Sequence, residues 1–329
     1  MSGTWTTYLL RFGEIGIKSR SVRRRFVDQL LENLEAHFHR AGATCLIDRQ
    51  WGRIYLDTPD EATARHAIAS TFGLVSGSPT VLVDATMEAI TGYIEKIAPD
   101  HVAPDQSFAI RARRTGQHPF TSQEVGAQGG AAVLRAVPEA RVDLTTPDVE
   151  ISVEVRDDKA YIFTETIQGP GGLPMGSQGS VVVPVLGPRS PAAAWLAMRR
   201  GAQVHLLVPE EAMALVEPLR GWAPNTPMTV VEGSWSREGL LALAAQVARE
   251  RDANAIVLDD HETRAGGSLL EGIPVLRPLA GLPGRRWPEG AYRASKAAAD
   301  AHPGPCVRAS GRTAEAVAGA LEESRRDRL

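Results

Sequence analysis

The chain has 329 residues, enough for two or three domains, and its 43% hydrophobic and 23% charged residues are typical of a globular protein. The formal net charge is −3, and as an average this value argues against a nucleic-acid binder, because such proteins are usually basic. Cys45 and Cys306 are too few cysteines for a disulfide scaffold or a four-cysteine zinc site. No apolar stretch approaches the roughly 20 residues of a membrane span, and no cleavable apolar leader is visible. We therefore expect a cytoplasmic protein without a membrane partner.

The first third of the sequence predicts strands and helices in the order β-α-β-β-α-β. Tyr8, Leu10 and Phe12 alternate with other residues, as the side chains on one face of a strand do. Ser21 is then expected to cap a helix that Gly42 ends. Strand-like runs over 44–48 and 53–57, an alanine-rich helix over 60–70 and an apolar run over 80–83 complete the order. This order is typical of the ferredoxin-like fold.

Positive charge is concentrated at the start of the first predicted helix. Between Arg11 and Arg25 only Glu14 is acidic, whereas six residues are basic: Arg11, Lys18, Arg20, Arg23, Arg24 and Arg25. Cations in the first turn of a helix oppose its dipole, so they are a poor choice for stability alone. Two interpretations remain open, a solvated loop and helix start or a patch that binds anions.

The middle third predicts a second basic segment. Residues 107–114 have the pattern of a strand, with basic side chains at Arg111, Arg113 and Arg114. Thr121 or Ser122 is placed to cap the helix that follows. A hairpin is expected from 151–155 and 161–164, and the glycine- and proline-rich residues 169–174 form a linker. Arg111 and Arg113 belong either to a cationic surface or to ion pairs with acidic side chains on a neighbouring strand.

From residue 179 onward, strands alternate with helices. Strands are predicted over 179–186, 203–208, 228–231 and 255–258, and helices from Ser190, over 210–219 and over 237–251. Pro191 suits the first turn of the helix that begins at Ser190. Such alternation predicts a doubly wound parallel α/β domain.

Several motifs, taken in order, resemble the tRNA 4-thiouridine synthases, which are tRNA sulfurtransferases. They are residues 11–15 with Lys18, residues 108–114, 120–122 and 142–144 with Pro147, and residues 153–156, 160–161, 164–165 and 169–174. The resemblance implies an α/β and α+β multidomain protein with three parts. These are a ferredoxin-like domain over 1–76, a THUMP RNA-binding domain over 77–170 and a degenerate pyrophosphatase-loop (PP-loop-like) domain over 175–329. The third part is similar to the adenine nucleotide alpha hydrolases.

The resemblance also implies a partner, the acceptor region of a tRNA, held by the first two domains. The residues carried over as RNA contacts are Lys18, Arg20, Arg24, Arg111, Arg113, Arg114 and His118. Arginine forks suit phosphates, and contacts to the backbone position an RNA without reading its bases. The near-neutral net charge thus conceals two local concentrations of cations, over 11–25 and 111–114.

The nucleotide loop of the family is altered in this chain. The family has Ser-Gly-Gly-x-Asp-Ser where Val185, Leu186, Gly187, Pro188, Arg189 and Ser190 stand here. Leu186 brings a Cβ where glycine lets the backbone approach phosphate, and Pro188 has no N–H to donate. Arg189 reverses the charge of an acidic residue that the family places beside metal and phosphates. Nucleotide contacts are limited to Gly187, Arg189 and Ser190. ATP and magnesium are expected as cofactors only if this site still works, and no other metal site is expected.

Two further features bear on catalysis. Cys306 is the candidate for the family's acceptor cysteine, but its surroundings match weakly and an incidental cysteine is favoured. Asp259, Asp260, His261 and Glu262 follow a predicted strand, where α/β folds place ligands. Because neighbouring side chains of an extended segment point in alternate directions, a solvated loop is favoured over a metal site.

These observations favour a tRNA-binding accessory factor in tRNA modification whose catalysis is impaired. The alternative is an active sulfurtransferase that makes 4-thiouridine with ATP and a persulfide donor. A third interpretation is a regulator that binds nucleotide without turnover. A homodimer, or a partner that donates sulfur or supplies the missing chemistry, stays open for each of them.

Overall fold

The computed structural model describes residues 4–17, 19–50, 52–260 and 268–280. The chain forms two compact units, each made of several stretches of sequence. The first unit comprises residues 1–11, 44–62 and 76–168. The second comprises residues 12–43, 63–75 and 169–329.

Nine strands form the sheet of the first unit in the described part of the chain. They are β1 (Thr6–Phe12), β2 (Leu46–Gln50), β3 (Arg53–Thr58), β4 (Leu74–Asp84), β5 (Ser107–Thr115), β6 (Arg141–Val142), β7 (Val149–Arg156), β8 (Lys159–Phe163) and β9 (Ile167–Gln168). Their order across the sheet is β2-β3-β1-β4-β8-β7-β5-β6, and β9 pairs with β4. Along the chain, β1 to β4 alternate with α1 (Arg20–Ala41) and α2 (Glu61–Ser70) in the ferredoxin-like order, which confirms the predicted fold.

The first long helix begins two residues earlier than expected. A 3₁₀ turn, Glu14–Ile17, comes before it, and α1 starts at Arg20 with Ser19 as its N-cap residue. The prediction of Ser21 as N-cap is therefore wrong, because Ser19 still has an extended ψ of 158° whereas Ser21 is already helical. The predicted helix end is confirmed. Gly42 has φ 65° there, a left-handed conformation that glycine adopts without strain.

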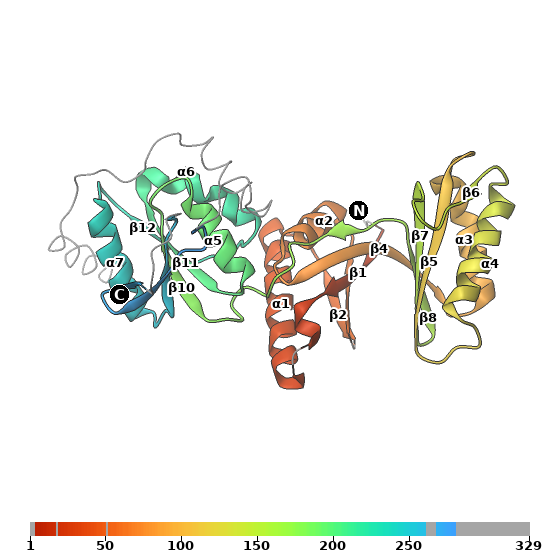
Figure 1. Ribbon diagram of the computed structural model, residues 1–329, viewed down its shortest axis with the longest axis horizontal. Coiled ribbons are helices and arrows are strands. Elements are labelled where there is room, and N and C mark those ends of the chain that lie inside the picture. The colour runs from red at the N-terminus through yellow and green to blue at the C-terminus, as the bar shows by residue number, and fades with distance from the viewer. Residues whose placement is uncertain (1–3, 18, 51, 261–267, 281–329) are drawn as a thin grey trace. The chain divides into compact units, whose positions relative to one another are not determined.

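Two helices cover one face of β5, β7 and β8 (Figure 1). They are α3 (Met87–His101) and α4 (Ser122–Ala136), of which only α4 was predicted. Gly129 lets them pack closely, since a Cβ at this position would lie 3.0 Å from the Cδ1 of Ile94. Thr121 caps α4 as expected. Its hydroxyl accepts from the N–H of Glu124, whose carboxylate accepts from the N–H of Thr121. The hairpin predicted to follow is formed by β7 and β8.

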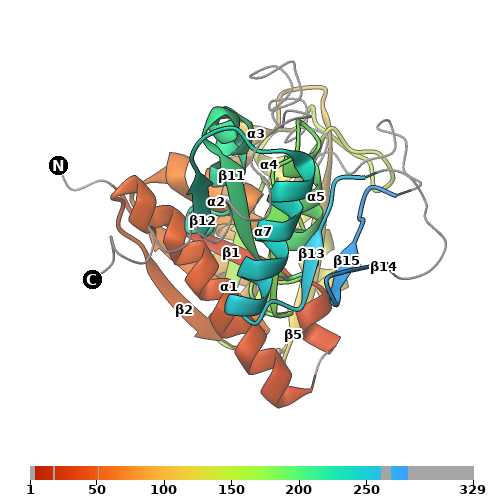
Figure 2. The ribbon, with the colours of Figure 1, turned by 90° about the vertical axis from the view of Figure 1, so that its left-hand side faces the viewer.

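The second unit contains a doubly wound sheet, as predicted. Its strands are β10 (Ser180–Pro184), β11 (Gln203–Pro209), β12 (Met228–Val231), β13 (Ala255–Val257), β14 (Ser268–Leu270) and β15 (Ile273–Leu276). Their order is β12-β11-β10-β13-β15-β14, with β14 antiparallel to β15 and the other pairs parallel. Figure 2 shows β13, β15 and β14 side by side. Val183 of β10 packs in one core with α5 (Ser190–Arg199), and Val182 in the other with α7 (Arg237–Glu250).

The segment expected as one helix over 210–219 is broken into three turns. They are a 3₁₀ turn over Glu210–Ala212, α6 (Met213–Val216) and a 3₁₀ turn over Glu217–Gly221. Pro218 explains why α6 ends at Val216, because it lacks the N–H that would continue the α-helical hydrogen-bond ladder. Among the described residues, no helix has both the length and the apolar character needed to cross a membrane.

Candidate nucleic-acid interface and nucleotide loop

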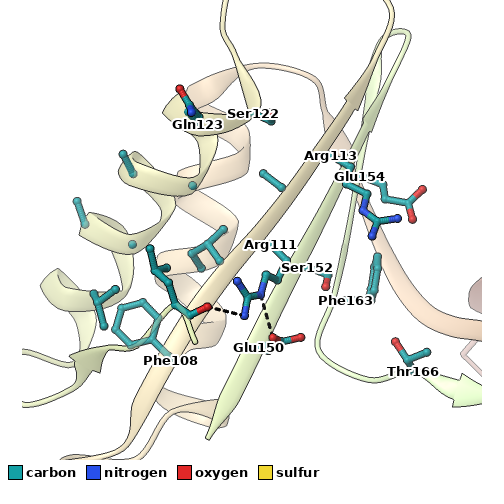
Figure 3. Close-up of a pocket in the computed structure, with 18 of the residues that line it drawn as sticks. Phe108, Arg111, Arg113, Ser122, Gln123, Glu150, Ser152, Glu154, Phe163 and Thr166 are labelled. Carbon is teal, nitrogen blue, oxygen red and sulfur yellow. Dashed lines mark hydrogen bonds and ion pairs between the residues drawn. The ribbon is translucent and has the colours of Figure 1, made fainter. Parts of the chain in front are cut away.

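A groove of about 1080 Å³ lies in the first unit, between α4 on one side and β5 and β7 on the other (Figure 3). The side formed by α4 consists of small residues, Gly126, Ala127, Gly130 and Ala131, and ends at Leu134. Side chains of this size leave room above the strands. The groove therefore owes its width to the glycine- and alanine-rich sequence of α4.

The open edge of β5 borders the same groove. β6 pairs only with Ser107 and Phe108 of β5. Beyond these two residues, β5 has no neighbouring strand on this side within the described structure. Ile110 and Ala112 line the groove there together with Phe108. The groove thus offers an apolar strand edge beside the side chains of the basic segment.

Arg111 is one of the predicted RNA contacts that line the groove. Its Nε donates to Glu150 Oε1 at 2.9 Å, and its Nη2 donates to the carbonyl oxygen of Leu144 at 3.0 Å (Figure 3). Glu150 lies on β7, the neighbouring strand, so Arg111 does pair with an acidic side chain in the way that one interpretation of the sequence proposed. Both side chains are about half exposed. An exposed ion pair of this kind contributes little to the free energy of unfolding. Arg111 can therefore release Glu150 and bind another anion instead.

Arg113 also lines the groove, and its surroundings differ. Its side chain is exposed, and it has no hydrogen bond or ion pair with another residue that the structure describes. Arg114 and His118 do not line the groove: Arg114 Nη1 donates to the Gly116 carbonyl at 2.9 Å, and His118 Nε2 lies 2.7 Å from the Asp157 carbonyl. Of the predicted contacts in this segment, the structure brings Arg111 and Arg113 together and leaves the other two outside the groove.

Sequence reasoning did not place a second set of residues at the groove. Arg11, Ser76, Glu154, Phe163 and Thr166 line it beside Arg113. The pairing of β5 with β7 could have indicated one of them, because Arg113 is the register partner of Glu154. Side chains of register partners point to the same face of a sheet. The others come from distant parts of the sequence, which the strand order brings together.

The predicted contacts at the start of α1 belong to the second unit. Arg20 and Arg24 are exposed, and no acidic residue lies in the first turn of the helix. Lys18 lies outside the described residues. This helix start therefore presents cations at the end where the helix dipole is already positive.

The loop over 185–190, between β10 and α5, turns its polar groups inward. The N–H groups of Leu186 and Gly187 both donate to the hydroxyl oxygen of Ser190, at 2.9 and 3.2 Å. The N–H of Ser190 donates to the Gly187 carbonyl at 3.0 Å. Val185, Leu186, Gly187 and Ser190 are buried, whereas Arg189 is exposed. The loop is thus held by hydrogen bonds among its own residues.

Comparison with known proteins identifies the family. Residues 7–78 match the model of the ThiI ferredoxin-like domain, and residues 84–165 match that of the THUMP domain. A probable tRNA sulfurtransferase of Methanobrevibacter smithii is 35% identical over 319 aligned positions, covering 83% of this chain and 82% of the relative. One of Methanothermobacter thermautotrophicus is 41% identical, covering 83% and 80%. The chain belongs to the tRNA sulfurtransferase family.

A solved structure extends this likeness over almost the whole fold. It is described as a 4-thiouridine synthetase in complex with RNA and with bound ATP, and it matches this chain with a TM-score of 0.71. The match covers 97% of this chain and 95% of that one at 22% sequence identity. At this identity the likeness shows the fold alone. It confirms the ferredoxin-like, THUMP and C-terminal α/β arrangement expected of a tRNA sulfurtransferase.

The membership of this chain in the family implies ATP at the loop over 185–190, but the residues present do not fit that group. A phosphate cradle needs backbone N–H groups that point outward. Here the N–H groups of Leu186, Gly187 and Ser190 are used inside the loop. Pro188 and Pro191 have none to offer. The cradle is filled by the Ser190 side chain.

The acidic residues after β13 are held by specific partners, so the solvated-loop interpretation is wrong for Asp259 and Asp260. Ser190 Oγ donates to Asp259 Oδ2 at 2.7 Å, and burial raises the pKa of Asp259 despite this hydrogen bond. Asp260 pairs with Arg237 at 2.7 Å and with Arg277 at 3.3 Å. His261, Glu262 and Cys306 lie outside the described residues. In the part of the chain that the structure describes, no three His, Cys, Asp or Glu side chains are grouped so as to hold a metal ion.

Proposed function

We propose that this tRNA sulfurtransferase homologue binds tRNA through the groove of its THUMP domain and acts in tRNA modification without turning over ATP itself. The observation that carries the proposal is the exposed Arg113 beside the Arg111–Glu150 pair in an open groove. Phosphate contacts from arginine supply most of the affinity of proteins that follow an RNA by shape. We further propose the tRNA contacts at Lys18, Arg20 and Arg24, which the family resemblance suggests.

The groove suits an RNA strand for two physical reasons. Its cations are arginines, whose planar forks bind phosphate oxygens in pairs. Its α4 side is lined by Gly126, Ala127, Gly130 and Ala131, so a bulky ligand can approach the helix closely. We also propose that Arg114, although outside the groove, adds to the positive potential at its mouth. His118 is hydrogen-bonded to the Asp157 carbonyl, so we propose that it supports RNA binding only indirectly, by holding its loop in place.

The second half of the proposal concerns the nucleotide loop. Its support is the set of hydrogen bonds that consume the loop's own donors and bury Ser190 against Asp259. Gly187, Arg189 and Ser190 remain the residues through which a nucleotide would have to bind. A homodimer or a sulfur-donating partner in the cytoplasm would then supply any missing chemistry. The division into domains over 1–76, 77–170 and 175–329 is part of the same proposal.

The first test measures tRNA binding against salt. The triple variant Arg111→Ala, Arg113→Ala and Arg114→Ala removes three cations. We expect its affinity to fall and its log-log salt slope to become shallower by about 2 to 3, because each lost phosphate contact releases about one counterion fewer. A matched control removes three cations of the same unit that do not line the groove: Lys96, Arg135 and Lys159.

The groove is excluded as the interface if both triple variants lose affinity equally, or if the wild-type protein binds tRNA without dependence on salt. The loop needs a separate test. Calorimetry with ATP and magnesium should give no binding heat. A reaction with tRNA, ATP, magnesium and a persulfide donor should give no 4-thiouridine absorbance. Product that disappears in Cys306→Ser would replace the second half of the proposal by an active sulfurtransferase and leave the first half intact.

A further inference from the structure

Glu154 is a buried carboxylate surrounded by guanidinium groups. It lies on β7 and is 5% exposed. Its Oε1 accepts from Arg11 Nε at 3.0 Å, and its Oε2 accepts from Arg53 Nη2 at 3.1 Å. Arg156 Nε lies 3.8 Å from Oε2. Burial alone would raise the pKa of Glu154, but Arg53 and Arg11 outweigh burial and hold the pKa below its ordinary value. The carboxylate is therefore charged whenever the protein is folded near neutral pH.

One carboxylate does not balance the cations around it. Arg113 is the register partner of Glu154 on β5, and Figure 3 shows both side chains on the same side of the sheet, near Phe163. Within the described residues, Arg11 and Arg53 have no acidic partner other than Glu154, and Arg113 has none. Burial lowers the pKa of Arg11, and the like charges of Arg53 and Arg113 lower it further. This end of the groove carries an excess of positive charge that a second anion would neutralise.

Arg11 is fixed in its orientation by three contacts. Besides Glu154, its Nη1 donates to Ser78 Oγ at 3.0 Å, and its guanidinium lies 4.6 Å from the centroid of the Phe163 ring. Ser78 Oγ in turn lies 3.2 Å from Thr166 Oγ1. Such a network keeps a partly buried charge in one place, where solvent and salt screen it less than a charge at the surface.

A purely stabilising role explains this arrangement poorly. Buried ion pairs are weak contributors to stability, because removing the charges from water offsets their attraction. Three cations around one anion add repulsion to that penalty. We propose that Glu154 is a positioning residue. It holds Arg11 in place so that, together with the exposed Arg113, the charged end of the groove binds a phosphodiester of the RNA; this inference rests on the proposed tRNA binding.

The test asks whether Glu154→Gln raises or lowers the affinity for tRNA. Glu154→Gln makes the groove more positive by one charge, so an electrostatic role alone predicts tighter binding of an unmodified tRNA transcript. A positioning role predicts the opposite. We expect the affinity to fall about tenfold, the size of one lost charged contact, and the salt slope to become shallower by about 1. Glu154→Asp, which keeps the charge on a shorter side chain, should recover part of the affinity.

Glu150→Gln is the matched comparison, because it removes the same charge from the same strand and the same groove. Its pair with Arg111 is exposed, so we expect binding about twofold tighter than wild type. Should Glu154→Gln bind like Glu150→Gln, Glu154 has no positioning role while the proposed tRNA binding stands. Absence of wild-type binding would instead remove the proposed function itself.

A second variant decides the question if Glu154→Gln does not fold, as judged by circular dichroism. Arg11→Lys keeps the positive charge but cannot reproduce the fork that contacts both Glu154 and Ser78. A positioning role predicts weaker binding, by about tenfold, and a shallower salt slope. Wild-type affinity in Arg11→Lys would overturn the proposal.

Discussion

The groove of the first unit and the loop over 185–190 in the second both stand where the sequence suggests a phosphate ligand, but they use their polar groups differently. In the groove, the Arg113 side chain has no partner among the described residues, and the acidic partner of Arg111, Glu150, is about half exposed. In the loop, the donors of Leu186 and Gly187 are taken by Ser190. The comparison teaches that a binding site is made by the polar groups that remain available after folding, and not by residue types alone.

The largest effect we expect follows from Phe108→Ala. Phe108 is completely buried below α4 and also lines the groove. Truncating a buried phenylalanine costs about 3–5 kcal/mol of unfolding free energy, because transfer energy is lost and a cavity remains. Urea unfolding with hydrogen exchange should place the loss in the first unit, and tRNA affinity should fall with it.

Leu240→Ala gives the matching loss in the second unit. Leu240 is completely buried in the core on the α7 side of the sheet. We expect about 2–5 kcal/mol of destabilisation there, with tRNA binding unchanged while the protein is folded. If this variant weakens tRNA binding as much as Phe108→Ala does, the groove is not the main interface.

Ser190→Ala tests the other side of the comparison. The change leaves the N–H groups of Leu186 and Gly187 and the carboxylate of Asp259 without their shared partner. A buried polar group left unsatisfied costs about 1–3 kcal/mol, which should appear as a lower denaturation midpoint. ATP and magnesium should not restore the midpoint. Restoration would mean that phosphate can occupy the place of the hydroxyl, because a ligand of the folded state stabilises it.

Periodic segments were the most predictable part of this fold. Val182 and Val183 pack in opposite cores, as expected for a strand covered on both faces, and Gly42 ends its helix as expected. The helix α3 was missed because its apolar positions, Ile90 and Ile94, follow a strand without a strong break. Thr86 was its available signal, since it accepts the capping hydrogen bond from Ala89.

The candidate site was predictable only where one segment carries it. Arg111 and Arg113 are two residues apart on one strand, so their shared face follows from the sequence. Glu154 and Arg11 reach the groove through strand pairings between residues far apart in the chain, which no local pattern specifies. The contact between Ser190 and Asp259 escaped prediction for the same reason, since it joins the start of α5 to the segment after β13, two residues 69 positions apart in the sequence.

We expect a smaller loss of unfolding free energy when the N-cap of α4, the helix that lines the groove, is removed. Thr121 and Glu124 cap α4 reciprocally, whereas Arg189 at the start of α5 makes no side-chain capping bond. Thr121→Ala should lower the unfolding free energy by about 1 kcal/mol. Thr86→Ala removes the cap of α3, which is not in the groove, and should cost about as much. Only Thr121→Ala should also weaken tRNA binding, and equal binding by the two variants would show that the start of α4 is not part of the interface.

The smallest effect we expect is in the pH dependence of the unfolding free energy. The contribution of Asp259, beside the loop, and that of Glu154, in the groove, should change with pH in opposite directions. Burial raises the folded-state pKa of Asp259, so its contribution to stability falls as pH rises from about 4, the ordinary carboxyl value, through the folded pKa. Glu154 has a lowered folded-state pKa, so its contribution is present above the ordinary value and is lost as pH falls through the folded pKa. The unfolding free energy of wild type minus that of Asp259→Asn should therefore decrease with rising pH. The same difference for Glu154→Gln should increase. In the loop, the Asp259 carboxylate accepts a hydrogen bond from one hydroxyl, whereas in the groove arginines surround the Glu154 carboxylate. If the two differences change with pH in parallel, the two carboxylates are not in these contrasting environments.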